Sequence, residues 1–183
     1  MTVEDIFDKE PRLKQMQQWL TDKGFYSYPA AIKHHGNHTG GLMEHSVSVA
    51  VCLQELTDKG VCTWVDKRSS ALVVGILHDV CKLDDYIDKN SEGIVVMGTG
   101  TPISKNPSWD YNPSKMFGGH GDKSIMMLSD VINLTEEEML CIRFHMGAYE
   151  QSDWSYYDAA IRKYESVLWT HTADMYASKV LNK

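Results

Sequence analysis

The sequence predicts an all-α fold that is interrupted by a loop or small β-ribbon around residues 90–119. Apolar residues recur with a helical period over most of the chain, and hydroxyl-bearing residues precede several of these segments as N-caps. Glycines and prolines gather in the one segment that breaks the period. With 183 residues, 43% of them apolar, the chain suits a single domain, 1–183, with a substantial core.

Charge and composition narrow the classes of function. A net charge of -7 argues against a broad basic face for duplex DNA or an anionic membrane. The four cysteines include no C-x-x-C pair, the N-terminus lacks the features of a signal peptide, and no apolar run has the roughly 20 residues of a membrane span. We therefore expect a soluble, cytoplasmic protein with reduced thiols, no membrane partner and, as for many soluble proteins, a possible homo-oligomeric state.

The first expected helices cover residues 11–22, ending before Gly24, and 42–58, with His45 in the first turn of the second. Four of the eight histidines lie between residues 34 and 45, mostly in the loop 34–41. A surface loop does not need this concentration of imidazoles, although for His34 individually a solvated loop histidine is an equal alternative.

The chain is organised around residues 77–82, Leu-His-Asp-Val-Cys-Lys, at the end of the apolar run 71–76. A helix would carry His78 and Asp79 as neighbours and return Lys82 to the same side one turn later. Two strong ligands and a cation on an otherwise apolar helix are costly to bury, and a divalent metal would satisfy them directly.

The acidic run 83–88 is expected to leave the core, and residues 90–119 are expected to form a loop or hairpin. The acids of 83–88 should mostly be solvated, and 94–97 could form one strand of a ribbon. The aromatic residues of this segment could stack on a base or pack over the core as a lid. They are Trp109, Tyr111 and Phe117.

A helical period resumes at His120, and a capping box that starts at Thr135 opens the next helix, which delivers His145 at its far end. A last helix is expected over 156–181. Its buried side should consist of Ile161, Tyr164, Leu168, Thr172, Met175 and Tyr176 or Lys179. Asp174 lies in the middle of this helix, where its low helix propensity requires a compensating partner such as a metal.

The order of these residues predicts a metal site. A lone helical histidine is more often a hydrogen-bonded core residue than a ligand, but here several histidines and aspartates occur on or at the ends of successive helices. The candidate ligands are His45, His78, Asp79, His120, His145 and Asp174. This mixed nitrogen and oxygen set suits Mn, Fe, Co, Ni or Zn.

These motifs resemble the HD-domain metal-dependent phosphohydrolase superfamily, which implies an HD-domain helical bundle. Residues 40–46 are similar to its first-histidine helix, 77–82 to its name-giving motif and 171–175 to its closing aspartate helix. Residues 119–124 and 143–147 are similar to those of small, often prophage-borne HD proteins and of the HD portion of a bacterial 3′-to-5′ exoribonuclease family.

The resemblance implies one or two divalent metals per chain. The first would be held by His45, His78, Asp79 and Asp174, with Asp79 bridging to a second held by His120 and His145. Two positions depart from the pattern: Cys81 stands where Gly is frequent, and Met146 stands where many two-metal members have a second adjacent His.

The implied activity is hydrolysis of a phosphate ester or anhydride of a nucleotide-like substrate by metal-activated water. The candidate catalytic residues are Asp79, Lys82 and His38, with His38 or His35 acting on phosphate or on the leaving group. Lys82 could also contact phosphate, as could Lys115, Lys123 and Arg143, although solvated charge is the commoner role for each of the last three.

Three rival functions are compatible with the same ligands. The first is a 3′-5′ nuclease or cyclic-nucleotide phosphodiesterase, with single-stranded RNA as one substrate, although the acidic charge and the lack of an appended nucleic-acid-binding domain disfavour the nuclease. The second is an oxygenase with a paired iron site, and the third is a non-catalytic module with a structural metal.

Overall fold

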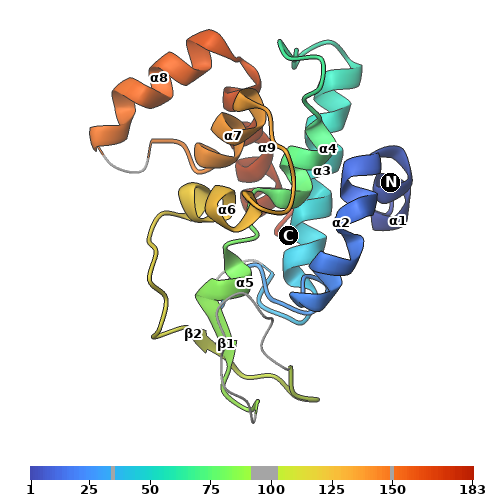
Figure 1. Ribbon diagram of the computed structural model, residues 1–183, viewed down its shortest axis with the longest axis vertical. Coiled ribbons are helices and arrows are strands. Elements are labelled where there is room, and N and C mark those ends of the chain that lie inside the picture. Colours follow the sequence, from blue (N-terminus) through green and yellow to red (C-terminus); the bar gives the residue numbers. More distant parts are fainter. Residues whose placement is uncertain (34–35, 92–102, 149–150) are drawn as a thin grey trace.

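The computed structural model describes residues 1–33, 36–91, 103–148 and 151–183. It is mostly helical with one small antiparallel ribbon, which confirms the all-α class with a small β insertion (Figure 1). In chain order the elements are α1 (Val3–Lys9), α2 (Pro11–Asp22), α3 (Gly41–Asp58), α4 (Ala71–Leu77), α5 (Lys82–Asp85), β1 (Tyr86–Asp88), β2 (Trp109–Tyr111), α6 (His120–Leu128), α7 (Glu136–Arg143), the 3-10 turn η1 (Gln151–Asp153), α8 (Trp154–Lys163) and α9 (Ser166–Lys179). The possible strand at 94–97 lies outside the described residues.

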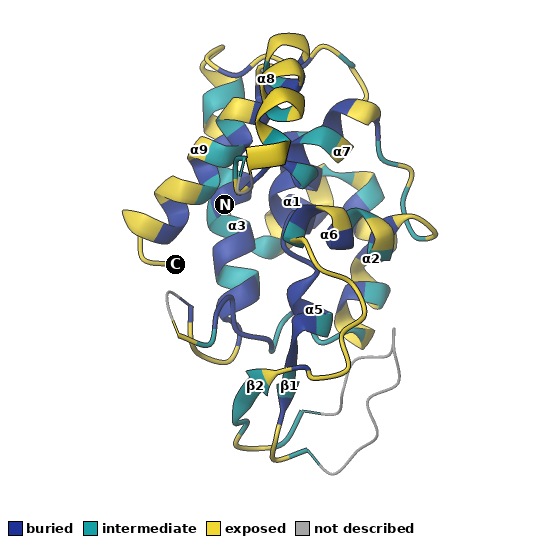
Figure 2. Ribbon diagram, turned by 90° about the vertical axis from the view of Figure 1, so that its left-hand side faces the viewer, coloured by how far each residue is buried: buried dark blue, intermediate teal, exposed yellow. Residues whose placement is uncertain are grey.

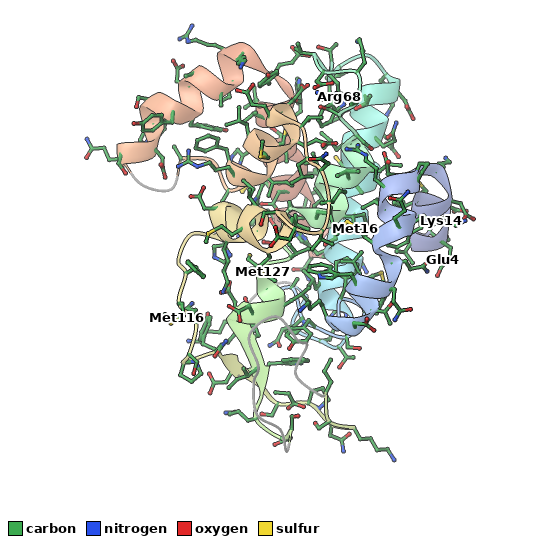
Figure 3. All side chains as sticks on the ribbon, in the orientation of Figure 1. Glu4, Lys14, Met16, Arg68, Met116 and Met127 are labelled. Carbon is green, nitrogen blue, oxygen red and sulfur yellow. The ribbon has the colours of Figure 1, made fainter. Side chains whose placement is uncertain are left out.

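Two short N-terminal helices, α1 and α2, cover one side of the core. Helix α1 was not among the expected helices, although a capping box marks its start: Asp5 N–H donates to the Thr2 hydroxyl, and Thr2 N–H donates to the Asp5 carboxylate. Met16 of α2 is buried and faces the core, whereas Glu4 of α1 and Lys14 of α2 lie on the outer side of this pair (Figure 3). The apolar face of this helix pair therefore covers one side of the core.

The centre of the protein is the packing of α3 against α4 (Figure 1). Every residue of α4 is buried, and Ser70 caps the helix by accepting a hydrogen bond from Val73 N–H at 3.4 Å. Gly75 makes the close approach possible, because a Cβ there would lie 2.3 Å from the Cα of Ala50. The two helices thus touch almost backbone to backbone.

A small ribbon extends from one end of the helical body (Figure 2). Tyr86 of β1 pairs with Tyr111 of β2 in antiparallel register. Asp88 is buried here and accepts hydrogen bonds from three backbone N–H groups, those of Asn90, Ser104 and Ser108. The carboxylate of Asp88 therefore holds the base of the insertion together.

The expectation that the acids after Lys82 are mostly solvated was wrong for Asp85 and Asp88. Asp85 accepts from Lys123 Nζ at 2.8 Å, and Asp88 has its three backbone donors. These donors are distant in sequence or lie in an irregular loop, so the local pattern did not reveal them.

Helix α7 is fixed by two buried glutamates. Its capping box at Thr135 is present as expected, with Glu138 as the reciprocal partner. Glu138 also forms a 2.8 Å ion pair with Arg12 of α2, and Glu137 accepts from the Ser166 hydroxyl of α9 at 2.6 Å. One turn of α7 thus connects helices from both ends of the chain.

The expected single helix over 156–181 is two helices, because the chain becomes extended at Tyr164 (φ -137, ψ 100). Tyr164 is buried, and its hydroxyl donates to Glu136 of α7. Glu165, next in the chain, accepts from both the backbone and the hydroxyl of Thr63. These tertiary bonds compensate for the interruption.

The break also changes which side of α9 is buried. Small residues such as Ala173 and Ala177 are buried. Four residues that were expected inside are exposed: Leu168, Thr172, Met175 and Tyr176. Small side chains allow α9 to pack closely on α3. In contrast, α8 is almost wholly exposed (Figure 2).

We predict that Gly75→Ala destabilises the protein by about 3 kcal/mol or more, because the added methyl group meets the backbone of Ala50 rather than a movable side chain. The measurement is the urea unfolding midpoint. Gly118→Ala is the matched control, since a Cβ there meets nothing within 4 Å, and it should change stability by less than about 0.5 kcal/mol. Equal midpoints for the two variants would contradict the close packing of α3 on α4.

Candidate metal centre

Five candidate ligands converge in the core from four parts of the chain. His45 comes from the start of α3, His78 and Asp79 from the turn after α4, His145 from the end of α7 and Asp174 from the middle of α9. The three imidazoles are at most 1% exposed, and Asp79 is 6% exposed. The structure thus brings together residues that are up to 129 positions apart (174 minus 45).

His45 is at the middle of the first group of donor atoms. Its Nε2 lies 3.2 Å from His78 Nε2, 3.0 Å from Asp174 Oδ1 and 3.9 Å from Asp79 Oδ2. His78 Nε2 lies 3.8 Å from the same Asp79 oxygen and 3.9 Å from Asp174 Oδ1. Donor atoms that share a metal at about 2.1 Å are roughly 3.0–3.4 Å apart, so the two shortest separations already have the required size.

The other nitrogen of each imidazole fixes its tautomer. His78 Nδ1 lies 2.8 Å from the backbone oxygen of Gly75, and His45 Nδ1 lies 3.1 Å from that of Lys183. A carbonyl oxygen only accepts, so Nδ1 donates in both rings. In the neutral rings this leaves a lone pair on each Nε2, the arrangement that backbone carbonyls impose on metal-binding histidines.

These lone pairs point toward one another. Burial lowers the pKa of His78 to about 4, so this ring is neutral at pH 7. Two facing lone pairs 3.2 Å apart repel, and either a proton, for which Asp174 Oδ1 at 3.0 Å from His45 Nε2 is an acceptor, or a metal ion removes that repulsion. With two carboxylates beside them, the donors form a mixed nitrogen and oxygen set that could hold a metal ion. The residues present therefore fit a metal, and His45, His78 and Asp79 form a buried group that could hold one.

The two oxygens of Asp79 face different partners. Oδ2 faces His45 and His78, whereas Oδ1 lies 3.4 Å from His145 Nε2 and 3.8 Å from Cys81 Sγ. Burial alone would raise the pKa of Asp79, but Lys82 and the neighbouring imidazoles hold it well below its usual value. Asp79 is thus an anion with one oxygen directed to each of two donor groups.

The second group consists of Asp79, Cys81 and His120, whose donor atoms all lie within 4.8 Å of one another. His120 stands at the start of α6, as the sequence analysis expected. Cys81 was not among the expected ligands. The sequence did place a thiol two residues after Asp79 in the same motif. A buried cysteine most often packs as a small apolar residue, however, so this position did not indicate a metal ligand.

The charged residues that were expected near the substrate differ in their burial and in their partners. Lys82 is 9% exposed and beside Asp79, with its Nζ 3.5 Å from the Tyr86 hydroxyl. His38 is half-exposed and pairs with Glu44, next to His45 in the chain. His35 lies outside the described residues.

Two of the lysines expected to contact substrate interact with other parts of the protein. Lys123 is 2% exposed, and its ammonium pairs with Asp84 at 2.6 Å and Asp85 at 2.8 Å. Its charge is therefore paired with two carboxylates inside the protein. Lys115 lies over the Tyr111 ring of the ribbon.

A cavity of ≈ 480 Å³ opens beside the second donor group. Its walls include His120, Arg143 and three glycines, among them Gly121, where a Cβ would lie 2.2 Å from the backbone oxygen of Arg143. The Arg143 guanidinium donates to both Asp122 and Asp153, which also line the cavity. His120, 39% exposed at its side chain, therefore faces both the cavity and the donor group.

Comparisons with known proteins returned no matching family model, curated protein or solved structure. The chemistry of the converging side chains is therefore the basis for interpreting this site. Within the described ranges, the helices all lack the combined length and apolarity that crossing a bilayer demands.

We predict that a divalent transition metal stabilises the folded protein. Free metal at about 100 times its Kd would add about 2.7 kcal/mol, which raises Tm by about 5–10 °C for a chain of this size. Differential scanning calorimetry with Mn²⁺, Co²⁺ or Zn²⁺, reversed by a chelator, measures this shift. It should vanish in His78→Ala and persist in His38→Ala, because His38 is an exposed histidine outside the two donor groups. An equal shift in both variants would place the metal elsewhere.

Proposed function

We propose that this protein is a metal-dependent phosphohydrolase of the HD type that cleaves a phosphate ester or anhydride of a nucleotide-like substrate. The observation that carries the proposal is the convergence of the His45, His78 and Asp174 donor atoms around a buried aspartate whose second oxygen faces a further donor group. The HD resemblance of the motifs supports the same assignment, and with it an HD-domain bundle.

The centre would hold its first metal through His45, His78, Asp79 and Asp174. A metal in this position supplies an activated water at neutral pH and neutralises charge on phosphoryl oxygens. The protein's part is to fix the donors: backbone carbonyls orient the imidazoles, and the packed helices α3, α4 and α9 keep the carboxylates in place.

Lys82 is proposed to bind the phosphoryl oxygens. Burial alone would lower the pKa of Lys82, but Asp79 raises it above its usual value, so the ammonium stays charged. Its Nζ lies 5.7 Å from the centre of the Tyr86 ring and 3.5 Å from the Tyr86 hydroxyl. A charge kept beside the metal ligands in a nearly dry site interacts more strongly with developing negative charge than it would in water.

The size of the cavity favours a small substrate. Its ≈ 480 Å³ lies within the range of about 300–1,000 Å³ for small-molecule sites. The overall charge of -7 does not favour binding a long polyanion. We therefore propose a mononucleotide-sized substrate with its phosphate near His120 and Lys82, rather than an RNA strand.

We predict that Asp79→Asn abolishes metal binding and hydrolysis together, with a loss of at least about 100-fold in kcat/KM, because the neutral amide is a weak ligand. The assay is product-resolved chromatography with Mn²⁺ across nucleoside mono-, di- and triphosphates, cyclic nucleotides and short RNA. Asp110→Asn, an exposed aspartate on β2, is the matched control and should retain activity. Full activity of Asp79→Asn, or no hydrolysis of any substrate by the unaltered protein, would overturn the proposal.

Lys82→Met should separate turnover from metal binding. The variant keeps the apolar stem but lacks the charge, so kcat is expected to fall about 100- to 1,000-fold while metal content, measured by elemental analysis, stays unchanged. Lys14→Met removes an exposed lysine charge on the outer side of α2 and serves as the control. An unchanged kcat would remove Lys82 from the mechanism.

A further inference from the structure

The second donor group contains a thiol that has no exposed surface. Cys81 is 0% exposed and lies in the turn between α4 and α5. Its Sγ is 3.5 Å from His120 Nδ1 and 3.8 Å from Asp79 Oδ1, and its backbone N–H donates to the Ser124 hydroxyl of α6. The thiol is therefore held between an imidazole and a carboxylate.

These separations are those of ligands around one tetrahedral metal. With about 2.3 Å from metal to sulfur and about 2.1 Å from metal to nitrogen or oxygen, sulfur lies about 3.6 Å from each of the other donors. The observed 3.5 and 3.8 Å lie on either side of this value. A neutral thiol needs no such enclosure, since a buried cysteine packs as a small apolar group.

A second observation points to a ligand at the same place. His145 Nε2 is buried, makes no hydrogen bond among the described residues and lies 3.4 Å from the Asp79 oxygen that faces Cys81. The other nitrogen, Nδ1, lies 2.7 Å from the Ile142 backbone oxygen, to which it donates. His145 Nε2 is thus directed to the side of Asp79 where the thiol lies.

We propose that Cys81 is a thiolate ligand of a second metal, which it holds together with Asp79 Oδ1, His120 Nδ1 and His145. Many two-metal members have a second adjacent histidine where this chain has Met146. On this assignment the Cys81 thiol supplies the ligand that this histidine would provide. The inference rests on the metal centre of the proposed function. When the sulfur–metal bond forms, the thiol loses its proton to the buffer, and no oxidation or reduction takes place.

The same contacts do not form a nucleophile with its base. In a cysteine–histidine–aspartate arrangement, the thiol and the carboxylate face opposite nitrogens of the ring. Here both Cys81 Sγ and Asp85 Oδ2, at 3.5 and 3.7 Å, face the same nitrogen of His120. The fully buried sulfur also has no surface on which to meet a substrate.

A thiolate changes which metals the second position prefers. Sulfur ligands favour Zn²⁺, Co²⁺ and Fe²⁺ over the harder Mn²⁺. The first group, with nitrogen and oxygen donors only, has no such bias. We therefore expect two bound cobalt or zinc ions per chain, with different coordination, and a weaker second site for manganese.

Cobalt absorption spectroscopy tests the assignment on the whole chain. The protein loaded with Co²⁺ should show visible d–d bands together with a near-ultraviolet sulfur-to-cobalt charge-transfer band. Cys81→Ser should lose the charge-transfer band and bind one cobalt in place of two. Cys141→Ala, which removes another fully buried thiol, should keep both features and is the matched control.

The outcomes separate the two proposals. Cobalt bound without a charge-transfer band, or a band that persists in Cys81→Ser, overturns the ligand role of Cys81 and leaves the proposed hydrolase in place. A protein that binds no cobalt overturns both.

Cadmium-113 NMR keeps the test decisive if Cys81→Ser does not fold. The unaltered protein should give two cadmium resonances, of which one is shifted far downfield by a thiolate ligand. Two resonances that both lie in the region of nitrogen and oxygen ligands would exclude Cys81.

Discussion

The close approach of α3 and α4 at Gly75 and Ala50 is the constraint on which the site depends. His45 lies five residues before Ala50 and His78 three residues after Gly75, so the antiparallel packing brings the two imidazoles together. Gly75 also provides the carbonyl oxygen that accepts from His78 Nδ1. One residue without a side chain thus sets both the distance between two ligands and the tautomer of one of them.

Buried charges hold the surrounding elements at this centre. Glu138 with Arg12 and Glu137 with Ser166 connect α7 to α2 and α9, which positions the turn that carries His145. Lys123 with Asp84 and Asp85 ties α6 to α5 on the side of His120. Burying an ion is costly unless its partners are complete, so these groups are useful as fixed points rather than as large sources of stability.

Asp79 gives the centre its asymmetry. One oxygen faces two imidazoles and the other faces a thiol and a third imidazole, so the proposed metals share one anion but have ligands of different softness. The first position is buried beneath α3 and α9, whereas the second adjoins the cavity through His120.

The sequence by itself determined the helical class, the capping box at Thr135 and the set of histidines and aspartates that meet in the core, because helical periods, caps and ligand types are local properties. It did not determine the break at Tyr164, the buried face of α9 or the internal pairing of Lys123, since each depends on a partner far away in the chain. Cys81 shows the same limit. Its residue type was visible, but only the packing of α6 against the turn after α4 places His120 Nδ1 and Asp79 Oδ1 around its sulfur.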